Sequence, residues 1–450
     1  MILPEHEHAV EAGLASEQAA WDAAPLPNGV DEAVLRGMLR ARRTTRRRSR
    51  RAMIAASAAV IIALLLGMVR VSPAFASAVA GLPGLSGIVS LVAGDQGLEG
   101  AVSNDYVQPV DAGDSHDGVT FAVKGIIADD TRLNVFYTVK LPSAASYVPY
   151  EEPRMYDADT GEALPVSISF GAVDTSGKPK KAFQERMDVS ISAGHAMPER
   201  VRMSVKLMGY PEEKTWNVVI PIDKARFADM KETIPLAQTV TVQGQRMRFA
   251  QAVVHPTSIT VDVAFDEANS MKLFSLSDLR IVTDTGEVLR SYGSTQVSPD
   301  KMKLQFESAF FAKPKHLTLI GSKIMALDKS KLELALDLGQ QRLVKSPDDR
   351  VRFIAAEKTG ADVYTVKLGV KTNRDRDNFN FTIVDGAFHD AAGTEFQFGS
   401  LRTSTDNGAD EDEVITTFEA KLDKPFTNPL TFPIVNYPSW IEQPFEVKLK

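Results

Sequence analysis

Residues 119–139 read VTFAVKGIIADDTRLNVFYTV, and this stretch decides the fold class. Apolar and polar residues alternate on both sides of a turn at Asp129-Asp130, which is the pattern of two strands that each bury one face. Similar runs recur twice further along the chain, with their turns at 255–257 and 359–360. Three hairpins of one design indicate three copies of one β unit.

Two further landmarks follow each hairpin in the same order. The first is a turn segment that reads DTGE at 159–162, DTGE at 284–287 and AGTE at 392–395. The second is a proline-led strand pair, whose last strand we place at 216–222, 332–338 and 445–449. Corresponding landmarks lie roughly 105 to 128 residues apart, which is the size of one small β-sandwich.

The chain is therefore predicted to be mainly β, with three tandem immunoglobulin-like β-sandwiches at residues 114–225, 226–342 and 343–450. A length of 450 residues and a hydrophobic fraction of 44% suffice for three cores of this size. The chain contains no cysteine, which excludes disulfides, thiolate zinc sites and thiol nucleophiles.

An uncharged run precedes the β units. Residues 52–69 read AMIAASAAVIIALLLGMV, which is long enough for one transmembrane helix. Arginines crowd the sequence directly before this run, at Arg42, Arg43, Arg46, Arg47, Arg48, Arg50 and Arg51. The positive-inside rule then predicts a single-pass protein of the cell membrane, with a cytoplasmic tail at 1–51 and an extracellular C-terminal part.

The apolar run has one alternative interpretation, the core of a signal peptide, because SPAFA at 72–76 contains a small-x-small pattern. A charged region of about fifty residues before the run favours an uncleaved anchor. Residues 70–113 follow the run and are broken by glycines and prolines. We expect short amphipathic helices in this juxtamembrane segment, which either rest on the outer leaflet or pack on the first sandwich.

The predicted tail is too short for a core of its own but contains an apolar stripe. The stripe recurs at three-to-five-residue spacing on an expected helix and consists of Val30, Val34, Leu35, Met38 and Leu39. A stripe that the tail cannot bury requires a partner, either a groove on another protein or the inner leaflet of the lipid bilayer.

The rest of the chain contains no recognisable catalytic or cofactor-binding motif. We therefore predict a protein that is not an enzyme and that has no cofactor and no metal site. The formal net charge of −7 gives no reason to expect direct nucleic-acid binding. The acidic loop at 406–413 is expected to be a solvated hairpin tip, with cation binding as an open alternative, and the basic loop at 178–181 is expected to be solvated surface.

Several segments resemble a family of single-pass proteins of Gram-positive, spore-forming bacteria. They read VSPAFA at 71–76, NDYVQP at 104–109, DGVTF at 117–121 and IADDTRL at 127–133. The outer part of such proteins is a domain of unknown function followed by an immunoglobulin-like domain. Members are typically encoded beside an extracytoplasmic-function sigma factor and are regarded as its negative regulators.

The resemblance implies an anti-sigma factor that holds an extracytoplasmic-function sigma factor at the membrane through the apolar stripe of the tail. An envelope ligand that reaches the outer part, or a site-specific protease acting near the span, would then release it. The zinc-dependent subclass does not apply, because the chain has no His-x-x-x-Cys-x-x-Cys pattern. The alternative is a cell-surface binding or adhesion protein with tandem sandwiches, whose tail only anchors it. The identity of the sigma factor, the signal and the oligomeric state stay open.

Overall fold

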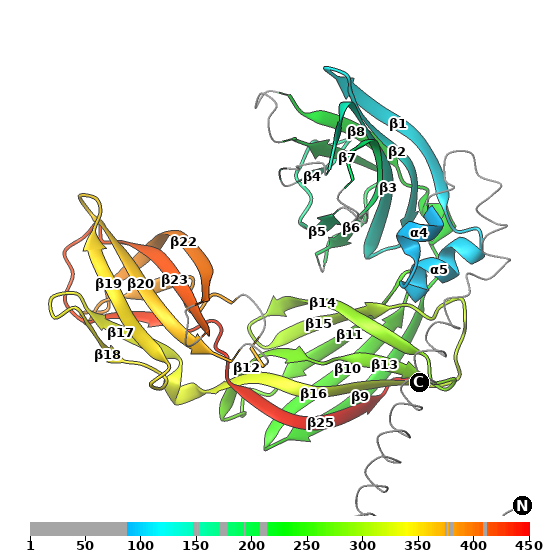
Figure 1. Ribbon diagram of the computed structural model, residues 1–450. Coiled ribbons are helices and arrows are strands. Elements are labelled where there is room, and N and C mark those ends of the chain that lie inside the picture. Colours follow the sequence, from blue (N-terminus) through cyan, green and yellow to red (C-terminus); the bar gives the residue numbers. More distant parts are fainter. Residues whose placement is uncertain are drawn as a thin grey trace, which may run out of the picture. The chain divides into compact units, whose positions relative to one another are not determined.

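The computed structural model describes residues 88–146, 151, 153–171, 178–192, 194–207, 214–373, 376–377, 381–407 and 412–450. The predicted tail, the predicted span and residues 70–87 of the juxtamembrane segment lie outside these ranges. In the part of the chain that the structure describes, no helix is long and apolar enough to cross a membrane. This part is mainly β, as predicted, and begins with two short helices (Figure 1).

The first β unit consists of two sheets around one apolar core. Its larger sheet has the order β1 (Gln108–His116), β2 (Val119–Ala128), β3 (Arg132–Ala145), β6 (Lys180–Ile191), β5 (Val166–Gly171). Its smaller sheet has the order β4 (Arg154–Asp157), β7 (Arg200–Val205), β8 (Trp216–Pro221). Trp216 is fully buried between the sheets, and its indole Nε1–H donates to the carbonyl oxygen of Val119 at 3.2 Å. This bond joins the two sheets.

The second β unit has a separate core and one continuous path of strands. It runs β12 (Met271–Ser277), β16 (Leu317–Asp328), β13 (Arg280–Thr283), β14 (Val288–Ser298), β15 (Lys301–Glu307), β11 (Ser258–Phe265), β10 (Gln245–Val254), β9 (Glu232–Val242), and β25 (Trp440–Lys448) pairs with β16. The third β unit runs β18 (Arg342–Lys345), β17 (Glu333–Asp337), β24 (Leu430–Pro433), β21 (Ala387–His389), β22 (Glu395–Asn407), β23 (Asp412–Lys421), β20 (Val363–Thr372), β19 (Val351–Lys358).

The three β units follow one plan. The hairpins predicted from the sequence are β2–β3, β10–β11 and β19–β20, and the first strand of each bulges at one residue. The bulged residues are Lys124, Ala250 and Ile354, and each precedes the first residue of its turn, Asp129, His255 or Thr359, by five positions. The turns of the second landmark also agree, because each contains a glycine with positive φ, at Gly161, Gly286 and Gly393.

The closing strands differ from the expectation. Strand β8 closes the first unit by pairing with β7. The equivalent position beside β16 is filled by β25, and the equivalent position beside β24 is filled by β17. The segment 332–338, expected to close the second unit, therefore lies in the third, and the segment 445–449 lies in the second. Figure 1 shows the red strand β25 beside β16.

The third β unit is thus inserted between two neighbouring strands of the second. The structure differs from the predicted boundary at 342–343, because β17 precedes it and belongs to the third unit. It also differs from the prediction that the third sandwich extends to residue 450, because β25 belongs to the second unit. Both closing segments have the alternation of a half-buried strand, and alternation alone does not identify which strand is the partner.

The helices of the predicted juxtamembrane segment pack on the first β unit. Helix α4 (Ile88–Val92) and helix α5 (Gln96–Ser103) contribute apolar side chains to its core, namely Ile88, Val92, Leu98, Ala101 and Val102. Of the two arrangements left open for this segment, the described part adopts packing on the sandwich. Strand β1 begins at Gln108, so the last residues of the predicted juxtamembrane segment belong to the first sheet.

Candidate functional site

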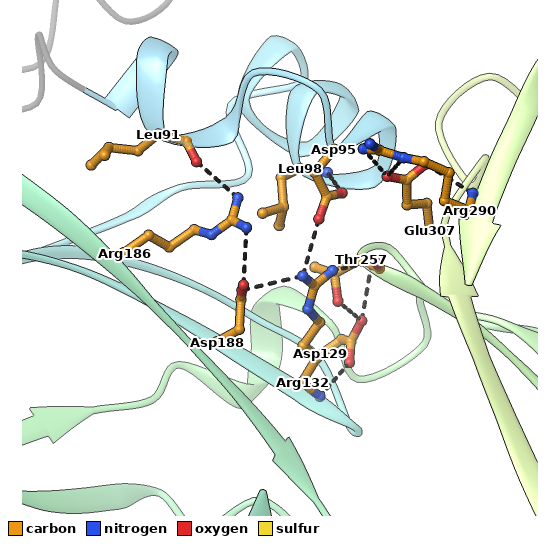
Figure 2. Close-up of polar contacts among 10 residues, drawn as sticks. All are labelled: Leu91, Asp95, Leu98, Asp129, Arg132, Arg186, Asp188, Thr257, Arg290 and Glu307. Atoms are coloured by element: carbon orange, nitrogen blue, oxygen red, sulfur yellow. Dashed lines mark hydrogen bonds and ion pairs between the residues drawn. The ribbon is translucent and has the colours of Figure 1, made fainter. Parts of the chain in front are cut away.

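Two sets of predicted residues lie outside the described residues. They are the partner-binding stripe, Val30, Val34, Leu35, Met38 and Leu39, and the arginines between 42 and 51 that are predicted to set the membrane topology. Their roles stay predictions. The described part of the chain contains a different feature that we take as the candidate site. It is a buried polar junction at which the first β unit, the second β unit and helix α5 meet (Figure 2).

The junction is built on the equivalent turns of two β units. In each turn the same backbone bond closes the hairpin, from the Asp129 N–H to the Arg132 carbonyl at 2.9 Å and from the His255 N–H to the Ser258 carbonyl at 2.8 Å. The Asp129 carboxylate joins the two turns, because its Oδ2 accepts from both the backbone N–H of Thr257, at 3.0 Å, and the Thr257 hydroxyl. Asp129 is 1% exposed and Thr257 is fully buried.

The other oxygen of Asp129 orders its own turn. Oδ1 accepts from the backbone N–H groups of Thr131, at 2.9 Å, and Arg132, at 3.0 Å. Both oxygens of this carboxylate are thus occupied by donors from the two turns. The geometry of the turn and the attachment to the second β unit therefore depend on one side chain.

Arg132 extends the junction to the helix. Its Nη1 donates to the Thr257 carbonyl at 3.2 Å, and its Nη2 donates to Asp95 at 3.0 Å and to Asp188 at 3.2 Å. Its guanidinium also lies 4.6 Å from the centre of the Tyr292 ring. Burial opposes the charge of Arg132, but Asp95, Tyr292 and Asp188 outweigh it and hold its pKa above the ordinary value. Arg132 is therefore a permanent cation bonded to three elements.

Asp95 has two roles in the junction. It is the N-cap of α5, where its Oδ1 accepts from the backbone N–H of Leu98 at 3.1 Å, while its Oδ2 holds Arg132. Gly97 lets the helix approach the second β unit closely. A Cβ at this position would lie 2.8 Å from the Thr257 carbonyl oxygen and 2.9 Å from the Ser308 nitrogen. Only glycine fits this backbone contact without a shift.

Further ion pairs surround this centre. Arg186 donates to the Leu91 carbonyl of α4 at 2.8 Å and to Asp188 at 2.9 Å, and Arg290 donates through Nε to Glu307 at 2.9 Å. Together with Asp95 and Arg132, these residues line a cleft of about 600 Å³. Its three arginines face three carboxylates, and each is engaged in the contacts above, as Figure 2 shows. Each of these six charged groups therefore has an oppositely charged partner within the described part of the chain.

Two acidic segments of the sequence, 157–162 and 406–413, connect consecutive strands. No group of three or more His, Cys, Asp or Glu side chains suited to a metal ion occurs among the described residues. Strands β22 and β23 pair as far as Asn407 and Asp412, which makes the acidic loop a hairpin connection, and residues 408–411 lie outside the described ranges. The Asp157 carboxylate accepts from the backbone N–H groups of Asp159, at 2.8 Å, and Thr160, at 3.1 Å, as in an Asp-Gly turn.

The two turns of the junction are repeat landmarks in the sequence, but their contact with each other was not predicted. The available signal was polar residues at the same place in two copies, since Asp129, Thr131, Thr257 and Ser258 interrupt otherwise apolar runs. Gly97 offered no signal, because a glycine in a Gly-rich segment is also typical of a loop.

Comparison with known proteins gives two partial matches to families. Residues 46–141 match a family described as "Domain of unknown function (DUF4179)", and residues 231–345 match one described as "Family of unknown function (DUF5643)". No curated protein matches the chain.

One solved structure with similarity to the chain is described as "The crystal structure of the conserved domain protein from Bacillus anthracis". It is 9% identical, and the match covers 71% of this chain and 92% of that chain with a TM-score of 0.35, too low to establish a shared fold. The informative result is the extent of the first family match. It runs from the end of the arginine-rich tail through the predicted span, both helices and the junction turn into strand β3 of the first β unit.

Proposed function

We infer that this chain is a membrane-anchored anti-sigma factor. In this proposal the cytoplasmic tail sequesters an extracytoplasmic-function sigma factor, one helix crosses the cell membrane, and three immunoglobulin-like sandwiches form an outer sensor. An envelope ligand or a site-specific protease provides the releasing signal. The proposal assigns no enzymatic activity and no nucleic-acid contact to the chain.

The observation that carries the proposal is the junction at Asp129, Arg132 and Asp95. The helices α4 and α5 are the first described elements after the predicted span, and Arg132 bonds the cap of α5 to both β units. A force or ligand that moves one β unit against the other must therefore break these bonds or move α5. Such a connection is what a sensor requires if an outer event is to reach the membrane.

The extent of the first family match supports the same module. A single matched region includes the predicted span, both helices and the Asp129 turn, so these parts recur together in other chains. On the inner side, the stripe Val30, Val34, Leu35, Met38 and Leu39 supplies the apolar face that a short tail needs to bind a partner groove.

A pull-down with residues 1–51 tests the proposal. The native tail is expected to capture one sigma factor, and the triple change Val34→Asp, Leu35→Asp, Met38→Asp is expected to abolish capture. The change Ala33→Asp adds a like charge to the opposite helix face and is expected to preserve it. If neither the native tail nor the Ala33→Asp tail captures a sigma factor, sequestration is contradicted.

The second candidate function is a cell-surface binding or adhesion protein. The observation in its favour is the construction of three outer β units on one plan, which is common in extended surface proteins. The two functions differ in what they require of the tail. Scrambling the stripe would leave surface binding intact and would abolish regulation.

A further inference from the structure

Strand β7 of the first β unit has one buried and one outward face. Val201, Met203 and Val205 point into the core and are at most 1% exposed. The intervening positions are Arg200, Arg202, Ser204 and, directly after the strand, Lys206. Two cations of the strand and Lys206 therefore lie on one face, in a chain whose formal net charge is −7.

The outward face forms a cleft together with the neighbouring strands β4 and β8. In the register of this sheet Arg154 lies opposite Ser204, Tyr156 lies opposite Arg202, and Ser204 lies opposite Asn217. These side chains and Lys206 line a cleft of about 350 Å³. Its volume suits a small polar group such as a substituted sugar or polyol.

The Arg202 side chain is held in a defined position. Its guanidinium lies 4.2 Å from the centre of the Tyr156 ring, and its Nη1 donates to the Ser204 hydroxyl at 3.3 Å. Ser204 in turn donates to Asn217 Oδ1. A guanidinium that is stacked and bonded in this way loses less rotamer freedom when it binds an anion.

The charges in the cleft are not balanced. Arg154, Arg202 and Lys206 face a single lining carboxylate, that of Glu151, and no ion pair of these three cations is found among the described residues. Arg200 provides the contrast, because it lies on the same face of β7 and pairs with Asp159 at 2.9 Å. Among the lining residues that the structure describes, three cations and one carboxylate leave an excess of two positive charges.

We propose that this cleft binds the phosphate of a phosphomonoester, carried by a sugar or polyol. A phosphomonoester carries about −1.5 to −2 charges at neutral pH and three acceptor oxygens, which match the excess charge and the two guanidinium groups. Ser204, Asn217 and Thr215 line the same cleft and supply hydroxyl and amide groups for the polyol. The phosphate belongs to a soluble metabolite or polymer end, or to the headgroup of a phosphomonoester lipid. The site does not depend on the tail or on sigma-factor binding.

Calorimetric titration of the full chain, purified in a non-ionic detergent, with glycerol 3-phosphate tests the proposal. Saturable binding to one site is expected, and it should weaken as salt is added. The double change Arg154→Gln, Arg202→Gln is expected to weaken binding at least about tenfold. The matched control Arg200→Gln is expected to leave the affinity unchanged.

Two further binding experiments define the class of ligand. Glucuronate, which carries a single carboxylate charge, is expected to bind more weakly than glycerol 3-phosphate. Co-sedimentation with vesicles that contain phosphatidic acid, compared with phosphatidylcholine alone, separates the sources. Binding of the vesicles but not of glycerol 3-phosphate identifies a lipid headgroup, and binding of glycerol 3-phosphate in solution identifies a soluble ligand.

The single change Arg154→Gln guards against a folding artefact, because Arg154 is exposed and its removal disturbs no hydrogen bond described above. Weaker binding by Arg154→Gln, with an unchanged thermal midpoint, supports the cleft. Absence of saturable binding to both glycerol 3-phosphate and phosphatidic acid vesicles overturns the proposal. An equal loss in Arg200→Gln, or equal affinity for glucuronate, also overturns it.

Discussion

The carboxylate of Asp129 in the first β unit accepts hydrogen bonds from both the backbone N–H and the hydroxyl of Thr257 in the second. The two residues occupy equivalent hairpin turns of a repeated unit. The repeat therefore supplies the contact between its own copies, and helix α5 joins the same contact through Asp95 and Arg132.

Replacing Asp129 tests the energy of this contact. Asp129→Ala removes the acceptor of two donors of Thr257 and leaves them buried, so the unfolding free energy is expected to fall by about 3 kcal/mol. Asp130→Asn is the control, since Asp130 pairs with Lys231 at the surface and its loss should cost less than about 1 kcal/mol. Urea unfolding measures both, and equal effects of the two changes would contradict the junction.

Gly97 tests the close approach of α5. In an isolated helix Gly97→Ala would stabilise by roughly 0.5–1 kcal/mol. Here the added Cβ meets two backbone atoms below 3.0 Å, so the net effect is expected to be a loss of about 1–3 kcal/mol. Gly100→Ala in the same helix serves as control, because the three atoms nearest to its Cβ belong to the Phe311 side chain and none is closer than 3.3 Å. A stabilising Gly97→Ala, measured by thermal unfolding, would show that α5 does not contact the second β unit.

His255 gives the junction a pH dependence with a defined sign. Burial lowers its pKa below the ordinary value of 6.5, although Asp129 and Asp130 act in the opposite direction. The imidazole therefore binds a proton more readily in the unfolded chain than in the folded chain. As a result, the unfolding free energy falls as the pH drops below 6.5. The slope of unfolding free energy against pH between about 7.5 and 5.5 should be smaller in His255→Gln. Identical slopes would exclude His255 as the cause.

Disulfide cross-linking can test the position of β25, because the native chain has no cysteine that would compete with the introduced pair. Thr318 lies opposite Lys448 on β16 and β25, so the pair Thr318→Cys, Lys448→Cys is expected to form a disulfide on mild oxidation. The pair Thr318→Cys, Glu333→Cys places the second thiol on β17 and is expected to stay reduced. Electrophoresis without reductant distinguishes them, and a cross-link only in the second pair would contradict the insertion of the third unit.

The packing of β25 has a second test at Gly321. A Cβ there would lie 2.7 Å from Phe445 Cε1 and 2.8 Å from Leu279 Cδ2. Gly321→Val is expected to displace β25 and lower the unfolding free energy by about 1–3 kcal/mol. Gly360→Ala is the control, because its Cβ would make ordinary van der Waals contact with the Val363 side chain, at 3.4 Å. Equal stability of the two variants, measured by urea unfolding, would contradict the packing.

The strands and turns that were predicted correctly are those that depend on local sequence patterns, namely alternation of apolar and polar residues and glycine-containing turns. The three hairpins and the turns at Gly161, Gly286 and Gly393 follow from such patterns. The exchange of β17 and β25 does not, because both segments alternate in the same way and partner choice depends on packing across the core.

Local sequence patterns could not predict the junction, for a related reason. Arg132 and Thr257 are far apart in the chain, and their contact depends on how two folded units meet. The cleft at Arg202 was missed because the cations come from strands β4 and β7, which are separated in sequence by other strands. The tail stripe and the predicted span lie outside the described residues and stay predictions.

The most direct test of sigma-factor sequestration is transcription from a promoter of the sigma factor in cells that carry the full chain. The wild-type chain is expected to repress this promoter, and Val34→Asp, Leu35→Asp, Met38→Asp is expected to raise transcription to the level of cells without the chain. Asp129→Ala, which alters only the outer junction, is expected to change transcription while the tail stays intact. Equal transcription in cells with the wild-type chain, with the triple variant and without the chain would contradict sequestration.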